Sequence, residues 1–183
     1  LITRYFYDGR NVIVERDGDG SNLARYTRGL SRGGGIEGII SALRGTDSSH
    51  YHSNGMGSVI ALTDGVSNDV QRYGYDAFGN PLPEGTETAP NAYRYSTKRH
   101  DPRSGLIYFG ARYYDPRIGR FITKDPLGMV DGPNRYAYVR NNPVNWIDPW
   151  GLARVGSRPL DNDWMPWNGD GDIRHDQIWY DDG

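Results

Sequence analysis

The sequence predicts a mainly β fold made of many short strands, with one or two short helical turns. Glycine and tyrosine are plentiful, at 25 and 14 of 183 residues, and hydrophobic residues make up only 36%. Globular chains usually contain about 45–50% apolar residues. Tyrosine is typical of strands and glycine of the tight turns between them. This composition favours small hairpins whose aromatic rings pack together, instead of one large aliphatic core.

A short pattern of tyrosine, aspartate and a glycine turn recurs along the chain, each time followed by an apolar β-type residue. It occupies residues 4–15 (RYFYDGRNVIVE), 71–82 (QRYGYDAFGNPL) and, more loosely, 111–121 (ARYYDPRIGRF). Alternate tyrosines place their rings on one face of a strand, and aspartate before a turn glycine is typical of hairpins. We therefore expect each unit to be a hairpin, and stacked units to bury their rings.

The segments between these units read as further strands and loops. Residues 51–65 predict a strand bounded by turns, and residues 36–43 fit either a strand or a helix. Residues 31–35 form a glycine-rich connector and residues 83–90 a polar loop. Pro133 followed by good helix formers predicts a brief helical turn through Tyr138.

Composition and motifs exclude several classes of function. The net charge of −2 favours neither nucleic acid nor an anionic membrane, and there is neither cysteine nor an apolar run of membrane-spanning length. His50 and His52 could share a metal, but no third ligand lies nearby in the sequence. Residues 17–20 and 170–172 resemble calcium loops without the required glutamate, so we interpret them as turns. We expect no cofactor and no metal site.

Several separated motifs then occur in a fixed order. They are Tyr93–Ser96, Gly110–Phe121, Asp125–Gly128, Asn134–Val139, Asn142–Pro143 and Asp148–Leu152. In order and spacing they resemble the RHS/YD-repeat family and its C-terminal RHS-associated core. The resemblance covers about residues 1–152 and implies three parts: YD-repeat hairpins over 1–92, the core over 93–152, and a variable tail over 153–183.

The resemblance implies a spiral β-shell that encloses a variable C-terminal toxin, with the core as the plug that seals one end. Members include polymorphic toxins, Tc-toxin C subunits and wall-associated proteins. The implied partners are upstream RHS repeats of the same or another chain, the enclosed toxin and an immunity protein. The implied localisation is secreted or at the bacterial cell surface. Because the chain begins at Leu1, we expect it to be the C-terminal piece of a longer protein.

In many members the core also cuts its own chain after the second Asp-Pro-x-Gly-Leu. By position, this cut would fall between Leu152 and Ala153. Asp125 and Asp148 are the candidate catalytic pair, because two carboxylates that share a site can act as acid and base. Arg112 matches the family's essential arginine, and it could hold one carboxylate ionised or polarise the scissile carbonyl.

A structural interpretation accounts for the same residues. Asp-Pro-x-Gly begins a type I turn without any catalysis, and Arg112 fits a structural ion pair. Two functions therefore stay open: an aspartyl autoprotease that acts once on itself, and a non-cleaving structural or cell-surface RHS module.

The tail beyond Leu152 contains seven Asp, three Arg and three Trp, which gives it a net charge of −4. Its 31 residues are too few for most enzymatic toxins. The tail fits a truncated or degenerate toxin, a small effector, or a segment that docks through Trp164, Trp167 and Trp179.

Overall fold

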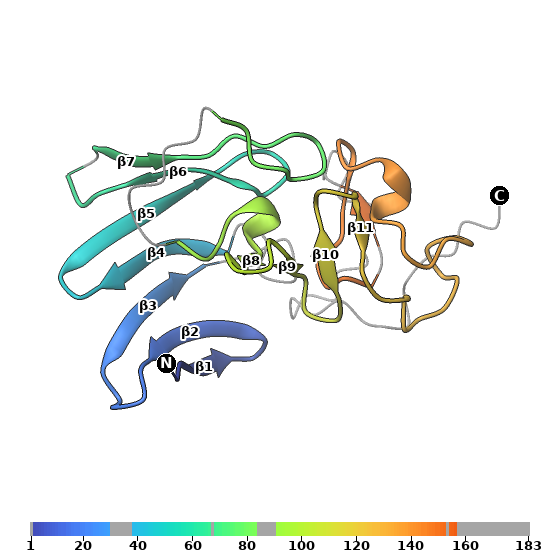
Figure 1. Ribbon diagram of the computed structural model, residues 1–183. Helices are drawn as coiled ribbons and strands as arrows, with labels where there is room; N and C mark the ends of the chain where they lie inside the picture. The colour runs from blue at the N-terminus through green and yellow to red at the C-terminus, as the bar shows by residue number, and fades with distance from the viewer. Residues whose placement is uncertain (1, 30–37, 67, 84–90, 153, 157–183) are drawn as a thin grey trace.

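The computed structural model describes residues 2–29, 38–66, 68–83, 91–152 and 154–156, and it confirms the mainly β fold (Figure 1). The first sheet has seven antiparallel strands in chain order: β1 (Arg4–Asp8), β2 (Asn11–Arg16), β3 (Asn22–Arg28), β4 (Ile39–Arg44), β5 (Asp47–Ser53), β6 (Val59–Thr63) and β7 (Asp69–Arg72). The second sheet has the order β11-β10-β9-β8, from β8 (Arg99–His100), β9 (Ile107–Tyr108), β10 (Tyr113–Asp115) and β11 (Arg120–Phe121). The third pairs β12 (Trp146–Ile147) with β13 (Val155–Gly156).

Four of the loops in and just after the first sheet share one hydrogen-bonding scheme. The first residue of each of these four loops is Asp or Asn, and its Oδ1 accepts hydrogen bonds from the backbone N–H groups two and four residues ahead. These bonds measure 2.8–3.0 Å in the loops that begin at Asp17, Asn54, Asp64 and Asp76. A side-chain oxygen thus replaces a backbone acceptor in each turn, which is the usual role of these residue types. The carboxylate of Asp17 is engaged in its own turn, as the sequence predicted.

The tyrosine-aspartate units agree with the prediction in part. Residues 4–15 form the β1–β2 hairpin, residues 113–121 form β10–β11, and the ambiguous segment 36–43 contributes to strand β4. The unit at 71–82 is no regular hairpin, because β7 ends at Arg72 and only an isolated bridge joins Tyr75 to Pro81. The expected burial of the rings holds in part, since Tyr73 and Tyr114 are buried. Tyr7 and Tyr113 are instead 58% and 45% exposed, and both line a cavity.

The helical turn predicted over residues 133–138 is wrong. Ala137 instead forms a β-bridge with Arg120, and the helical turn follows at Val139–Asn141. All three residues of this turn have positive φ, between 43° and 59°. Non-glycine residues seldom adopt this left-handed region, so the ordinary start signals of a helix do not indicate it.

A second turn of this kind, Tyr95–Thr97, is fixed by contacts from the first sheet. Ser96 and Thr97 have φ values of 51° and 52°. The N–H of Ser96 donates to Ser58 Oγ at 2.9 Å, and Thr97 Oγ1 donates to the carbonyl of Gly57 at 2.6 Å. Tertiary hydrogen bonds thus offset the backbone strain of this turn.

An aromatic cluster forms the core beneath the second sheet. Its buried members are Tyr95, Ile107, Phe109, Tyr114, Phe121, Tyr138 and Val139. The rings meet mostly edge to face or tilted, with centroids such as those of Tyr114 and Tyr138 4.6 Å apart. These geometries are favourable for aromatic pairs. The residues of the candidate site pack against this cluster.

Gly79 allows this cluster to approach the loop that begins at Asp76, and we expect Gly79→Ala to destabilise the fold. Its φ is +90°, and an added Cβ would lie 2.6 Å from Tyr95 Cγ. Strain and overpacking together should lower the free energy of unfolding by about 2–4 kcal/mol, measured by urea denaturation. Gly9→Ala is the matched control, because Gly9 also has positive φ but has nothing within 4 Å of its added Cβ. Equal losses in the two variants would contradict the steric account.

Candidate functional site

Four aspartates of the chain precede a proline, and all four make the same local turn. In each, Oδ1 accepts a hydrogen bond of 2.9–3.1 Å from the backbone N–H two residues ahead. These aspartates are Asp101, Asp115, Asp125 and Asp148. All four Asp-Pro pairs therefore have the predicted turn-forming role. The four turns differ in the partner of the second carboxylate oxygen, Oδ2.

In two of these turns the second oxygen faces a buried arginine. Asp125 Oδ2 lies 3.0 Å and Asp148 Oδ2 lies 3.6 Å from the same atom, Arg112 Nη2. All three side chains are only 3–4% exposed. In the other two turns, Oδ2 is engaged by a neighbour on its own turn, Ser104 or Arg117. The structure thus brings the three predicted catalytic side chains together in a single buried cluster.

The guanidinium of Arg112 is held in one orientation by contacts on several sides. Its Nε donates to the carbonyl of Gly151, and its Nη1 donates to the carbonyl of Arg135 at 3.1 Å. Its face lies 3.7 Å from the ring centroid of Phe121. A planar guanidinium can make these bonds and stack at the same time, which a lysine ammonium cannot do. Arg112 therefore joins the two carboxylates to the backbone just before Leu152.

The backbone after Asp148 wraps around its carboxylate. Oδ1 accepts hydrogen bonds from the N–H groups of Trp150, Gly151 and Leu152, at 3.1, 2.7 and 3.0 Å. Gly151 has a φ of +71°, and a Cβ there would lie 3.0 Å from that of Phe109. Glycine is thus required both by the conformation and by the close approach. As a result, the main chain that leads to Leu152 is fixed relative to Asp148.

Burial sets the protonation of Asp148. The loss of hydration raises the pKa of Asp148 to about 6, although its three backbone hydrogen bonds and Arg112 favour the charged form. This carboxyl group therefore titrates near pH 6, closer to neutral pH than an ordinary aspartate does. A shifted carboxyl beside a second carboxylate is the arrangement that separates an acid from a base in paired-carboxylate sites.

Lys98 is a component of the site that the sequence did not reveal. Its Nζ donates to the carbonyl of Pro149 at 2.6 Å, within the turn that Asp148 begins. Burial lowers the pKa of Lys98 to about 7, while the nearby Asp148 acts in the opposite direction. Lysine is almost always exposed, so nothing in the pattern around residue 98 indicated a buried ammonium.

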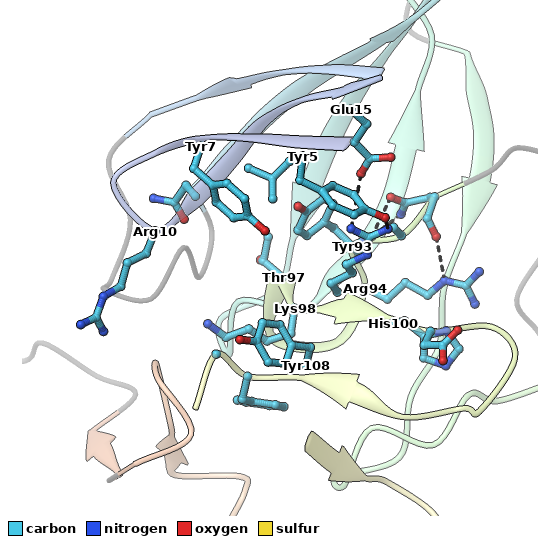
Figure 2. A pocket seen from close by; sticks show the side chains of 18 of the residues that line it. Tyr5, Tyr7, Arg10, Glu15, Tyr93, Arg94, Thr97, Lys98, His100 and Tyr108 are labelled. Atoms are coloured by element: carbon cyan, nitrogen blue, oxygen red, sulfur yellow. Dashed lines mark hydrogen bonds and ion pairs between the residues drawn. The ribbon is translucent and has the colours of Figure 1, made fainter. Parts of the chain in front are cut away.

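The proposed cleavage point lies beside a large cavity. Leu152 is half-buried, and Ala153 lies outside the described residues. Leu152 and Trp150 help to line a cavity of about 1620 Å³. Figure 2 shows Lys98 and Tyr108 on one side of this space, and Tyr5 and Tyr7 of the β1–β2 hairpin on the other.

Two further properties concern the described part of the chain. It contains no group of three or more His, Cys, Asp or Glu side chains placed to hold a metal ion. No helix in it has the length and apolar character needed to cross a membrane.

Sequence comparison identifies relatives of this chain among bacterial nucleases and toxin subunits. Residues 37–144 match the family model described as Teneurin YD-shell. The tRNA3(Ser)-specific nuclease WapA of Bacillus spizizenii is 40% identical over 158 residues, which cover 82% of this chain and 7% of WapA. Toxin subunit YenC2 of Yersinia entomophaga is 49% identical over 75 residues, 41% of this chain and 8% of YenC2.

Structural comparison gives the same result. The crystal structure of TcdB2-TccC3 matches with a TM-score of 0.62 and 27% identity, over 82% of this chain and 8% of that one. The chain therefore spans less than a tenth of the length of these relatives. The ordered motifs, the β meander that leads into a compact aromatic core, and these similarities agree. The chain belongs to the RHS/YD-repeat family.

Proposed function

We propose that this chain is the sealing end of an RHS shell, and that it cuts itself once between Leu152 and Ala153. The observation that carries the proposal is the convergence of Asp125 and Asp148 on Arg112 Nη2. Asp-Pro turns elsewhere in the chain direct the second oxygen to a neighbour on their own turn. A purely structural turn does not require two buried carboxylates around one guanidinium, and burial of charges is costly.

The proposed reaction is hydrolysis of one peptide bond. Asp125 takes a proton from a water molecule, whose oxygen attacks the carbonyl carbon of Leu152. Asp148, which is mostly protonated below about pH 6, transfers its proton to the nitrogen of Ala153 as the C–N bond breaks. The products are a carboxyl group at Leu152 and an amine at Ala153. Because the bond is tethered to the site, the pair acts at a high effective concentration.

Arg112 has a positioning role in this scheme. Its Nε contacts the carbonyl of Gly151, one residue before the carbonyl that is attacked. It therefore fixes the main chain just before the scissile bond, and its Nη2 provides the positive charge between the two carboxylates. Of the two roles that the sequence left open for this arginine, the geometry favours the charge on the carboxylates over polarisation of the scissile carbonyl.

Intact-mass measurement on freshly purified protein tests the proposal directly. We expect two products, residues 1–152 and 153–183, with no added protease. A single uncut chain after prolonged incubation would support the second candidate function, a non-cleaving RHS structural module. The turn bonds made by Oδ1 of all four Asp-Pro aspartates favour that alternative, since they need no catalysis. A fragment that ends at Gly151 would contradict the proposed position of the cut.

The cleavage rate should depend on pH through Asp148. Its pKa is raised to about 6, so the protonated acid is abundant below that pH and becomes scarce above it. We expect the rate to fall about tenfold per pH unit between about pH 7 and 9, because only the protonated fraction reacts. The measurement is the time course of fragment formation after refolding from urea at each pH. A rate that rises across this range would exclude Asp148 as the proton donor.

Family membership supports a proposal for the wider biological role. We propose that the part over residues 1–92 continues the wall of a shell formed by upstream RHS repeats, that the core over 93–152 closes it, and that an effector follows Leu152. Both named sequence relatives are bacterial: YenC2 is a toxin subunit, and WapA is a tRNA-specific nuclease. A secreted or surface location, and an immunity protein as a further partner, belong to this proposal. The tail over residues 153–183 would be the start or the remnant of the effector.

A further inference from the structure

The chain just after the proposed cut is paired with the chain just before the Asp148 turn. Strand β13 (Val155–Gly156) pairs antiparallel with β12 (Trp146–Ile147), with Gly156 opposite Trp146. The Asp148–Leu152 segment and the proposed scissile bond therefore lie within the connection between two paired strands. The segment after the proposed cut is thus attached to the RHS-associated core by the pairing of β13 with β12.

A second attachment comes from Arg154, the second residue after the proposed cut. Its Nη1 lies 2.9 Å from Asp131 Oδ1, and both side chains are only 17–18% exposed. Its guanidinium also lies 4.8 Å from the ring centroid of Trp146. One side of the group is thus paired with a carboxylate, and its face is stacked on an aromatic ring. Both contacts favour a positively charged side chain at this position.

Two arginines, Arg154 and Arg140, favour the charged form of Asp131. Burial raises the pKa of Asp131, while Arg154 and then Arg140 lower it. Arg140 Nε lies 3.4 Å from Asp131 Oδ1, but its side chain is 45% exposed. Arg154 is therefore the closer and more buried of the two partners. Arg140 belongs to the core itself and provides a matched comparison, because it contacts the same carboxylate without touching the downstream segment.

We propose that Asp131 and Trp146 form a downstream subsite of the autoprotease, which takes a basic side chain two residues after the cut. The inference rests on the proposed function and adds its sequence specificity. Upstream, Leu152 N–H is bound to Asp148 and the Gly151 carbonyl to Arg112. Downstream, Arg154 is held by Asp131 and Trp146. The scissile bond is held between the two, and small displacements of a reacting bond are costly to the rate.

Asp131 and Arg154 act as positioning residues, since the hydrogen bonds and ion pairs described for the two catalytic carboxylates involve neither of them. We expect Arg154→Ala to slow cleavage about 10- to 100-fold, because the downstream side of the bond loses its anchor. Asp131→Asn should slow cleavage to a similar degree, and the double variant should be no slower than the slower single one. Arg154→Lys should restore most of the rate, because it keeps the positive charge. Arg140→Ala should slow cleavage much less than Arg154→Ala, because Arg140 is the more distant and more exposed partner of Asp131.

The test is the time course of fragment formation by intact mass, after refolding of the full 183-residue chain at constant pH. Each variant is also made with Asp148→Asn, which we expect to prevent cleavage. The urea midpoints of these uncut forms show whether each substitution affects folding. Wild-type protein that never cleaves would overturn the proposed function itself. Cleavage of Arg154→Ala at the wild-type rate, in protein that does cleave, would overturn the subsite alone. The subsite would also be overturned if Arg140→Ala slowed cleavage as much as Arg154→Ala, or if Arg154→Lys failed to restore it.

Discussion

Asp148→Asn is expected to leave the chain uncut, with a rate loss of at least about 1000-fold, the upper part of the range for removal of a general acid. Asparagine keeps the shape of the side chain, and its carbonyl oxygen can still accept the N–H groups of Trp150, Gly151 and Leu152. It has no proton to transfer near neutral pH. The turn should therefore persist while the reaction stops, and intact mass should show one species.

Asp115→Asn is the matched control for this variant. Asp115 also precedes a proline, is 8% exposed, and makes the same turn bond to the N–H two residues ahead. Its second oxygen, however, binds the largely exposed Arg117 and not Arg112. We expect Asp115→Asn to cleave like the wild type. If Asp148→Asn also formed residues 1–152 at the wild-type rate, the proposed chemistry would be wrong.

The same mechanism predicts a distinct result for Asp125. Asp125→Asn removes the group assigned to activate water, and one of the two negative charges beside Arg112. We expect a loss of cleavage comparable to that of Asp148→Asn, without recovery at lower pH. A variant that still cuts would point to a single-carboxylate mechanism.

The sequence indicated the fold class and the three catalytic candidates because these depend on residue type and order. Composition and the recurring Tyr-Asp-Gly pattern predicted the strands and hairpin turns. The paired Asp-Pro-x-Gly motifs predicted turns that do form around Asp125 and Asp148. Motif order, through the family resemblance, then predicted which arginine belongs beside them. No single periodicity could have identified Arg112, which lies 13 and 36 positions before its two carboxylate partners.

Features that depend on tertiary contacts did not follow from the pattern. The left-handed turns at Tyr95–Thr97 and Val139–Asn141 consist of non-glycine residues, so local propensity disfavours them. Lys98 is buried by the packing of the Asp148 turn on the aromatic cluster, which no local signal reveals. The pair Asp131 and Arg154 joins positions 23 apart, across a segment without regular periodicity. Each of these features requires the assembled fold before it can be predicted.

Removal of Arg112 should affect stability as well as cleavage. Arg112→Leu would leave Asp125 and Asp148 buried without a positive partner, and loss of one member of a buried ion pair costs about 3–5 kcal/mol. A small β domain has about 5–15 kcal/mol in total, so this variant should lose a large part of its free energy of unfolding. Arg112→Lys keeps the charge but cannot reach the Gly151 and Arg135 carbonyls together with both carboxylates. It should stay folded and cleave at least about 100-fold more slowly.

The stability and the cleavage effects of Arg112 can be separated with a second substitution. Adding Asp125→Asn to Arg112→Leu removes one of the two buried charges left without a partner. The double variant should therefore be more stable in urea than Arg112→Leu alone, a non-additive result expected for residues in contact. It should still leave the chain uncut, because the base is absent. Arg117→Lys, on an arginine that is 64% exposed, should change neither property. If the double variant were less stable than Arg112→Leu, the charge-compensating role assigned to Arg112 would be wrong, since neutralising Asp125 would then have relieved nothing.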